Sequence, residues 1–206
     1  MTVPSSDCLW SERFERDSCG FGLIAHLKGE ASHRLVNVAI EALVRLTHRG
    51  AVAADGRTGD GCGVLMTTPF AFLRRVAAED GLELPERFAA GMVFLNPGAE
   101  SASRARRELE QTLLAEGVTT LGWRRVPVDQ SVCGEQALRS LPAIEQIFVA
   151  WPEGDDENSL NRRLYMARRR AELALAENDP VFYIASLSCT TLAWKAMVMP
   201  AFLTRF

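Results

Sequence analysis

Apolar residues recur every three or four positions in four stretches of the chain, and this spacing predicts helices. The predicted helices span about residues 32–50, 69–79, 100–116 and 157–178. Ser32 is a good N-cap for the first helix, which ends at Gly50. Each helix therefore has one apolar face that must be covered by another part of the molecule.

Shorter apolar or alternating runs predict strands. They lie at about residues 21–27, 64–66, 88–95, 118–128, 144–150, 181–189 and 191–199. The last two runs are joined by a short Ser/Cys/Thr connection, which predicts a β-hairpin. Because several strands are consecutive and no strict βαβ repeat occurs, the pattern favours an α+β layered sandwich over a doubly wound parallel sheet.

A glycine-rich stretch, residues 55–63, separates the first helix from the next apolar run. It contains four glycines and two aspartates, which predicts a loop with unusual backbone angles. No Lys-Ser or Lys-Thr pair follows it, so a phosphate-binding P-loop is excluded. A tight turn into a strand and a place beside a functional site remain equally good interpretations.

Charge and composition exclude several classes of function. The 206 residues are 48% hydrophobic and 24% charged, with a formal net charge of −3, which is ordinary for a globular domain. An acidic chain lacks the dominant basic face that nucleic acids and anionic membranes require. The five arginines at 162, 163, 168, 169 and 170 are therefore interpreted as a solvated or interdomain helix face.

Five cysteines, at 8, 19, 62, 133 and 189, form no Cys-x-x-Cys pair, so neither a zinc site nor an iron–sulfur cluster is supported. An odd number favours a reducing compartment. The first 18 residues lack the apolar core of a secretory signal, and no apolar run is long enough to cross a membrane. We therefore expect a cytoplasmic protein.

Cys19 is the strongest candidate for chemistry, because it leads directly into the apolar run at 21–27. If the chain is cut before it, the residue carries both a thiol nucleophile and an α-amine that can act as its base. Glycines at 20 and 22 would let the backbone approach a substrate closely. The alternative is a buried structural cysteine, which residue statistics alone favour.

Three motifs bear on that choice: ERDSCGFGLIAH at 15–26, THRGA at 47–51 and ADGRTGDGCG at 54–63. Together and in this order they resemble the start of the glutamate synthase large chain, a class II glutamine amidotransferase domain. The segments at 141–149 and 162–170 are similar to that family as well, so the resemblance covers nearly the whole chain.

The resemblance implies a four-layer αββα sandwich of the N-terminal nucleophile hydrolase type. It implies that residues 1–18 are a propeptide cut off before Cys19, and that residues 19–206 are the N-terminal portion of the amidotransferase domain. Cys19 is then the nucleophile and its α-amine the base, with Arg49 and Gly20 as supporting residues near the site. The family's FMN and iron–sulfur cluster belong to later domains, so no cofactor or metal is expected in this chain.

The function implied is release of ammonia from L-glutamine, through a Cys thioester, for glutamate synthesis in nitrogen assimilation. The implied partners are L-glutamine and the remaining synthase domains or small subunit, with no nucleic acid and no membrane. Two family segments, Arg-Phe-Ser-Thr and His-Asn-Gly-Glu, do not occur in the 206 residues, so we expect a domain that is truncated at its C-terminus and inactive alone. Two alternatives stay open: a non-catalytic remnant or interaction domain, and, more weakly, another class II amidotransferase such as the phosphoribosyl or glucosamine phosphate enzymes.

Overall fold

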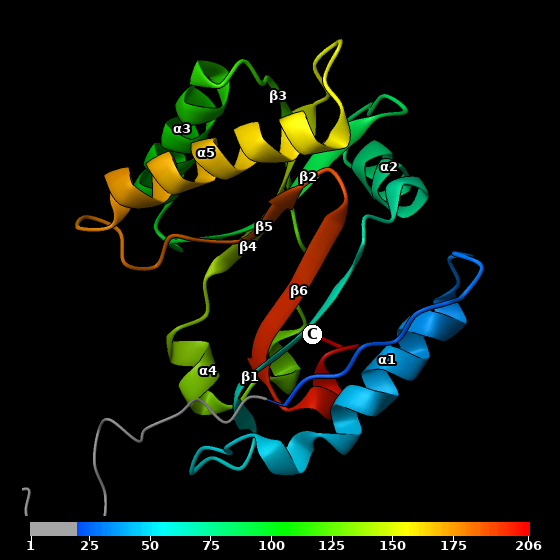
Figure 1. The fold of residues 1–206 in the computed structure, drawn as a ribbon. Coiled ribbons are helices and arrows are strands. Elements are labelled where there is room, and N and C mark those ends of the chain that lie inside the picture. The colour runs from blue at the N-terminus through cyan, green and yellow to red at the C-terminus, as the bar shows by residue number, and fades with distance from the viewer. Residues whose placement is uncertain (1–19) are drawn as a thin grey trace, which may run out of the picture.

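The computed structural model describes residues 20–206 as a mixture of helices and antiparallel strands (Figure 1). In chain order the helices and strands are α1 (His33–Arg45), β1 (Thr58–Thr67), α2 (Phe70–Glu79), β2 (Phe88–Leu95), α3 (Ala99–Ala115), β3 (Thr120–Arg125), α4 (Glu135–Arg139), β4 (Ala143–Ala150), α5 (Glu157–Leu175), β5 (Tyr183–Ser188) and β6 (Thr191–Val198). Short 3-10 turns are η2 (Thr47–Arg49), η3 (Gln130–Val132) and η4 (Pro200–Phe202). The mixed α and β composition and the antiparallel pairing agree with the predicted α+β class.

Four strands form one antiparallel sheet in the order β3-β4-β2-β5. Its central strand β2 is almost entirely buried. Gly91 lies where neighbouring side chains converge from β4 and β5, since a Cβ added there would sit 2.8 Å from Ile147 Cγ2 and 2.9 Å from the Ser186 carbonyl oxygen. A side chain at this position would therefore force the strands apart.

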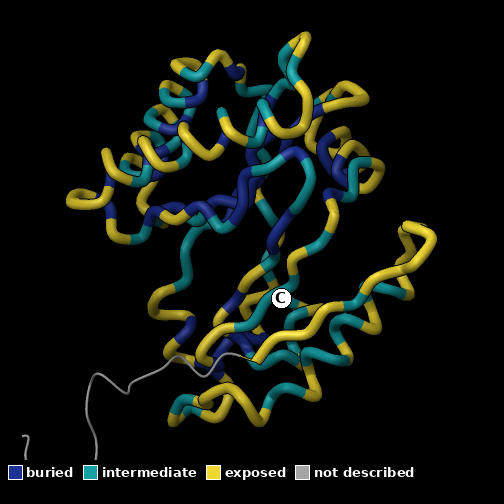
Figure 2. Tube along the Cα trace, in the orientation of Figure 1, coloured by how far each residue is buried: buried dark blue, intermediate teal, exposed yellow. Residues whose placement is uncertain are grey.

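Helices α3 and α5 cover one face of this sheet (Figure 1). Their inward positions recur every three or four residues, as the sequence pattern predicted, and they pack on Val93, Ile147 and Ile184 of the sheet. The buried helix positions are Ala102, Ala105, Leu109 and Leu113 in α3 and Leu160, Leu164, Ala167, Ala171 and Leu175 in α5. Figure 2 shows long buried runs in the strands of this sheet, whereas α3 and α5 alternate between buried and exposed residues.

One buried ion pair joins α3 to the sheet. Arg106 of α3 donates two hydrogen bonds to the Glu145 carboxylate of β4, one of them 2.7 Å long. The Glu145 side chain is only 9% exposed, whereas that of Arg106 is 32% exposed. The hydrogen bonding to Glu145 raises the pKa of Arg106.

The opposite face of the sheet packs against α2 and β6. Phe88 and Phe148 meet edge to face with ring centres 5.9 Å apart, and Leu73 of α2 and Leu192 of β6 complete this second core. Strand β6 does not belong to the four-stranded sheet but pairs with β1 in a separate two-stranded sheet. Two sheets are thus packed together in the middle of the molecule.

Helix α1 lies on the far side of the two-stranded sheet, where it contacts β1 and η4 (Figure 1). None of its residues is buried, and Figure 2 shows it in the colours of intermediate and exposed residues. Ser32 caps it as predicted, since the Ser32 Oγ accepts a hydrogen bond from the Leu35 N–H.

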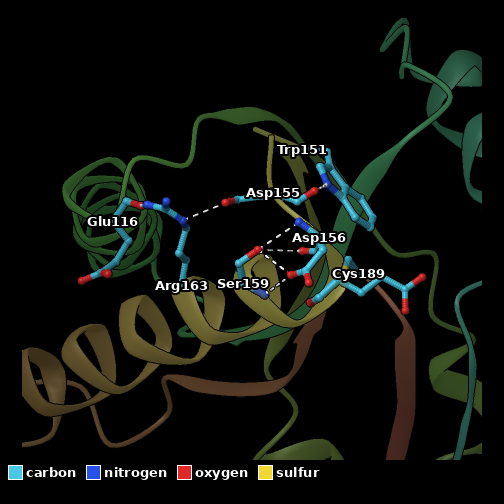
Figure 3. Close-up of polar contacts among 8 residues, drawn as sticks. Glu116, Trp151, Asp155, Asp156, Ser159, Arg163 and Cys189 are labelled. Carbon is cyan, nitrogen blue, oxygen red and sulfur yellow. Dashed lines mark hydrogen bonds and ion pairs between the residues drawn. The ribbon is translucent and has the colours of Figure 1, made fainter. Parts of the chain in front are cut away.

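The start of α5 is fixed by a dense set of polar contacts (Figure 3). Asp156 and Ser159 form a capping box, in which the Ser159 N–H donates to the Asp156 carboxylate at 2.7 Å. Arg163 pairs with Asp155 at 2.9 Å and donates to the Glu116 carbonyl at 2.8 Å, which attaches α5 to the end of α3. The arginines at 168, 169 and 170 also pair with carboxylates, so four of the five arginines of α5 are ion-paired at the surface.

Three predicted elements differ in the structure. Residues 21–27 form no strand, because no neighbouring backbone pairs with them, and Phe21 and Leu23 are about nine-tenths exposed. The predicted β-hairpin is wrong: β5 pairs with β2 and β6 pairs with β1, so the Cys189-Thr190 connection crosses from one sheet to the other. The segment 129–142, in which no helix or strand was predicted, contains η3 and α4.

The glycine-rich stretch, predicted as a loop up to Gly63, is mostly strand, since β1 begins at Thr58. A Cβ on Gly59 would come within 2.8 Å of the Val198 carbonyl oxygen, and Gly63 is similarly crowded by the backbone at Trp194. These glycines therefore allow β6 to approach closely. None of the helices in residues 20–206 has the length and apolar content that a membrane crossing requires.

Candidate functional site

The structure brings together two of the three site residues predicted from the sequence. Cys19 lies outside the described residues, but Gly20 directly follows it. A Cβ added to Gly20 would lie 3.3 Å from both Cβ and Cγ of Arg49 and 3.8 Å from Leu46 Cδ1. The backbone next to Cys19 therefore rests against the stem of Arg49, and a larger residue at position 20 would push on it.

Arg49 is held at the point where the chain leaves α1. Its N–H donates to the Leu46 carbonyl at 2.8 Å, and the Gly50 N–H donates to the Thr47 carbonyl at 3.2 Å, which closes η2. The Thr47 hydroxyl donates to the Val44 carbonyl at 2.6 Å. Arg49 itself is exposed, so its position depends on these local hydrogen bonds more than on burial.

Asp60 connects this turn to the glycine-rich strand, a role that the sequence did not indicate. Its Oδ2 accepts a hydrogen bond from the Ala51 N–H at 3.0 Å, and its own N–H donates to the Ala51 carbonyl at 3.2 Å. The next residues continue the contact as a β-bridge between Val52 and Gly59. Asp60 thereby attaches the His-Arg-Gly turn to β1.

Asp55 attaches the other end of the glycine-rich stretch to α4. Its carboxylate accepts hydrogen bonds from the N–H groups of Arg57, Thr58 and Gln136 and from the Thr58 hydroxyl, which hold the pKa of Asp55 well below its usual value. The hydroxyl of buried Thr58 also accepts from the Ala137 N–H at 3.2 Å. An Asp three residues before a Thr is a common turn pattern, so the hydrogen bonds between Asp55 and Thr58 could have been predicted from the sequence.

A cavity of about 880 Å³ lies between the end of α1, the glycine-rich strand, β6 and the segment 133–142. Gly20 and Arg49 are on its wall, and so are Asp60 and Lys195, the other charged residues among the described lining. Most of the remaining wall is apolar, as in many small-molecule sites. The cavity beside Gly20 is therefore large enough for a small polar substrate.

The three described cysteines are poorly suited to nucleophilic chemistry at neutral pH. Burial, and then the negative charge of Asp60, raise the pKa of Cys62 to about 11. Burial is also the main cause that raises the pKa of Cys133 and of Cys189. These thiols stay protonated and unreactive, so none of them competes with Cys19.

No group of three or more His, Cys, Asp or Glu side chains in residues 20–206 is arranged to hold a metal ion.

Comparisons with known proteins identify the family of the chain. The sequence pattern of the family Glutamine amidotransferases class-II matches residues 19–206. The chain is 42% identical over 194 residues to ferredoxin-dependent glutamate synthase 2 of Synechocystis, 39% over 195 residues to the large chain of glutamate synthase [NADPH] of Azospirillum brasilense, and 36% over 199 residues to that of Bacillus subtilis. These matches cover 93 to 96% of the chain but only 12 or 13% of each relative. The chain thus belongs to the class II glutamine amidotransferases and resembles the N-terminal part of the glutamate synthase large chain.

Proposed function

We propose that this chain carries the nucleophile of a glutamine-hydrolysing site. The Cys19 thiolate attacks the side-chain amide carbon of L-glutamine to form a tetrahedral oxyanion. As this collapses, the C–N bond breaks, and the α-amine of Cys19 delivers a proton to the departing ammonia. Water, activated by the same amine, then attacks the glutamyl thioester, which releases glutamate and restores the thiol.

The contact between Gly20 and Arg49 is the observation that carries this proposal. It places the residue after Cys19 on the wall of the cavity, beside a cation that favours the thiolate over the thiol. The family match that starts at residue 19 supports cleavage between Ser18 and Cys19, with residues 1–18 as a propeptide.

The arrangement of layers supports the N-terminal nucleophile hydrolase fold. Helices α3 and α5 cover the four-stranded sheet, which packs on β6 of the two-stranded sheet, and α1 lies beyond β1. We infer that these layers are those of the four-layer αββα sandwich.

The relatives are glutamate synthases, so we further propose that the ammonia released here serves glutamate synthesis within a larger protein. Glutamine is then the substrate, and other synthase domains are the partners. The 206 residues contain neither Arg-Phe-Ser-Thr nor His-Asn-Gly-Glu, which the family uses for the substrate carboxylate and the oxyanion. We therefore expect little turnover from these residues alone, because loss of one oxyanion donor typically slows a reaction by about 100- to 1000-fold.

The test is ammonia release from glutamine by a polypeptide that contains these residues and also the Arg-Phe-Ser-Thr and His-Asn-Gly-Glu segments. We expect Cys19→Ala and Cys19→Ser to abolish turnover, while the control Cys189→Ala, which removes a buried thiol that is not on the cavity wall, retains it. Intact-mass measurement should show a chain that begins at Cys19. Turnover that persists in Cys19→Ala would rule out the proposed nucleophile.

A further inference from the structure

Asp60 makes an unusual use of its carboxylate. It is exposed on the cavity wall, yet Oδ2 is engaged by the Ala51 N–H at 3.0 Å, while Oδ1 lies 2.9 Å from the position that a Cβ on Gly50 would occupy. Any side chain at position 50 would displace the carboxylate. The Asp60 carboxylate can therefore occupy this position only because residue 50 is glycine and has no side chain.

Apart from the Asp60 carboxylate, the turn is held by local hydrogen bonds and not by burial. Residues 47–51 are half-buried or exposed, and η2 is closed by two backbone hydrogen bonds. Arg49 lies within this turn, and its stem is the surface on which Gly20 rests. A continuous series of contacts therefore leads from the Asp60 carboxylate through Gly50 and Arg49 to the residue that follows Cys19.

We propose that Asp60 is a positioning residue of the glutamine-hydrolysing site: it fixes the Arg49 turn on which Gly20 rests and, through Arg49, sets the reactivity of Cys19. This inference rests on the proposed function and deepens it. Asp60 acts as a hydrogen-bond acceptor, so its charge is dispensable and its oxygen is not. Asn at position 60 keeps an acceptor for the Ala51 N–H, whereas Ala removes it, and the two variants separate these contributions.

The readout is alkylation of individual cysteines in the 206-residue chain by iodoacetamide, followed by peptide mass spectrometry from pH 5 to 10. The Arg49 cation should place the Cys19 midpoint in the wild-type chain below the usual value of about 8.5 for a thiol. In Asp60→Ala we expect this midpoint to rise by about one pH unit, which slows labelling at pH 7 about tenfold. Asp60→Asn should label Cys19 at nearly the wild-type rate.

The other cysteines are internal controls. Buried Cys133 and Cys189 report opening of the fold and should stay protected in both variants. Cys62, whose pKa is about 11, should be labelled slowly across this pH range, and faster in both variants, because each removes the Asp60 charge that helps to raise that pKa. If Asp60→Ala opens the fold, Gly50→Ala replaces it, since the added methyl group displaces the carboxylate without deleting it.

Unchanged Cys19 labelling in both Asp60→Ala and Gly50→Ala, with Cys133 and Cys189 still protected, would overturn the role of Asp60. A failure of the proposed function is visible separately in the unaltered chain. There, a Cys19 that titrates like an ordinary thiol would refute the activated nucleophile and, with it, any residue that positions it.

Discussion

The ion pair between Arg106 and Glu145 gives the sharpest stability prediction. In Arg106→Met the apolar stem remains, but the Glu145 carboxylate, 9% exposed, loses both of its hydrogen bonds to the guanidinium. Removal of one partner of a buried pair typically costs about 3–5 kcal/mol, because the remaining charge is left without compensation. Since the Arg106 side chain is 32% exposed and water can reach the vacated space, we expect about 3 kcal/mol, the lower end of that range.

Urea unfolding at pH 7, followed by far-ultraviolet circular dichroism, measures this loss as a change in the free energy of unfolding. Arg104→Met is the matched control, because Arg104 lies on the exposed side of the same helix and should change stability by no more than about 0.5 kcal/mol. The double variant Arg106→Met with Glu145→Gln removes both charges and should recover much of the loss. If Arg106→Met and Arg104→Met cost the same, the pair contributes nothing and the argument from burial is wrong.

Two further predictions follow from the fold and the site. Gly91→Ala should lower the free energy of unfolding by about 1–3 kcal/mol, because the Ser186 carbonyl oxygen that the new methyl group would meet belongs to the backbone and cannot rotate away; a melting temperature equal to that of the unaltered chain would contradict this. The folded chain holds the Asp55 pKa below its unfolded value, so this residue stabilises the fold above pH 4, and the stabilisation is lost as the pH falls further. Asp55→Asn should therefore be less stable than the unaltered chain at pH 7 and should lose less stability between pH 5 and pH 3. Urea unfolding midpoints at pH 3, 5 and 7 test this.

The elements that the sequence predicted well are those with a local cause. β2 and β4 were placed to within one residue, because long apolar runs bounded by turn residues specify buried strands. α3 and its end before Gly117 followed from a 3.6-residue period and from a glycine whose φ of +75° suits a helix terminus.

The elements that failed depend on partners far away in the chain. The run at 21–27 has strand-like residues, but a strand needs a neighbouring backbone, and the described residues supply none. β5 and β6 are adjacent in sequence and were paired with each other for that reason, yet each pairs with a different sheet. Two strands that are adjacent in sequence need not pair with each other when the fold contains two sheets.

The candidate site was found in part for the same reason. Arg49 and Gly20 came from motif resemblance, and the structure brings them together. The functions of Asp55 and Asp60 are hydrogen bonds to backbone groups, one to the start of α4 and one to the His-Arg-Gly turn, and no side-chain pattern announces such partners. The sequence alone does not distinguish an aspartate that holds the backbone in place from one that takes part in catalysis.

The pairing of β1 with β6 also determines when the cavity can form during synthesis of the chain. The cavity wall at Cys62 is completed by Val198, 136 positions later in the chain. During synthesis the ribosome must therefore release nearly all of these residues before the cavity beside Gly20 is complete. If the peptide bond before Cys19 is cut by the cysteine itself, that cut belongs to the last stage of folding, and nascent chains stalled before residue 191 should retain their first 18 residues.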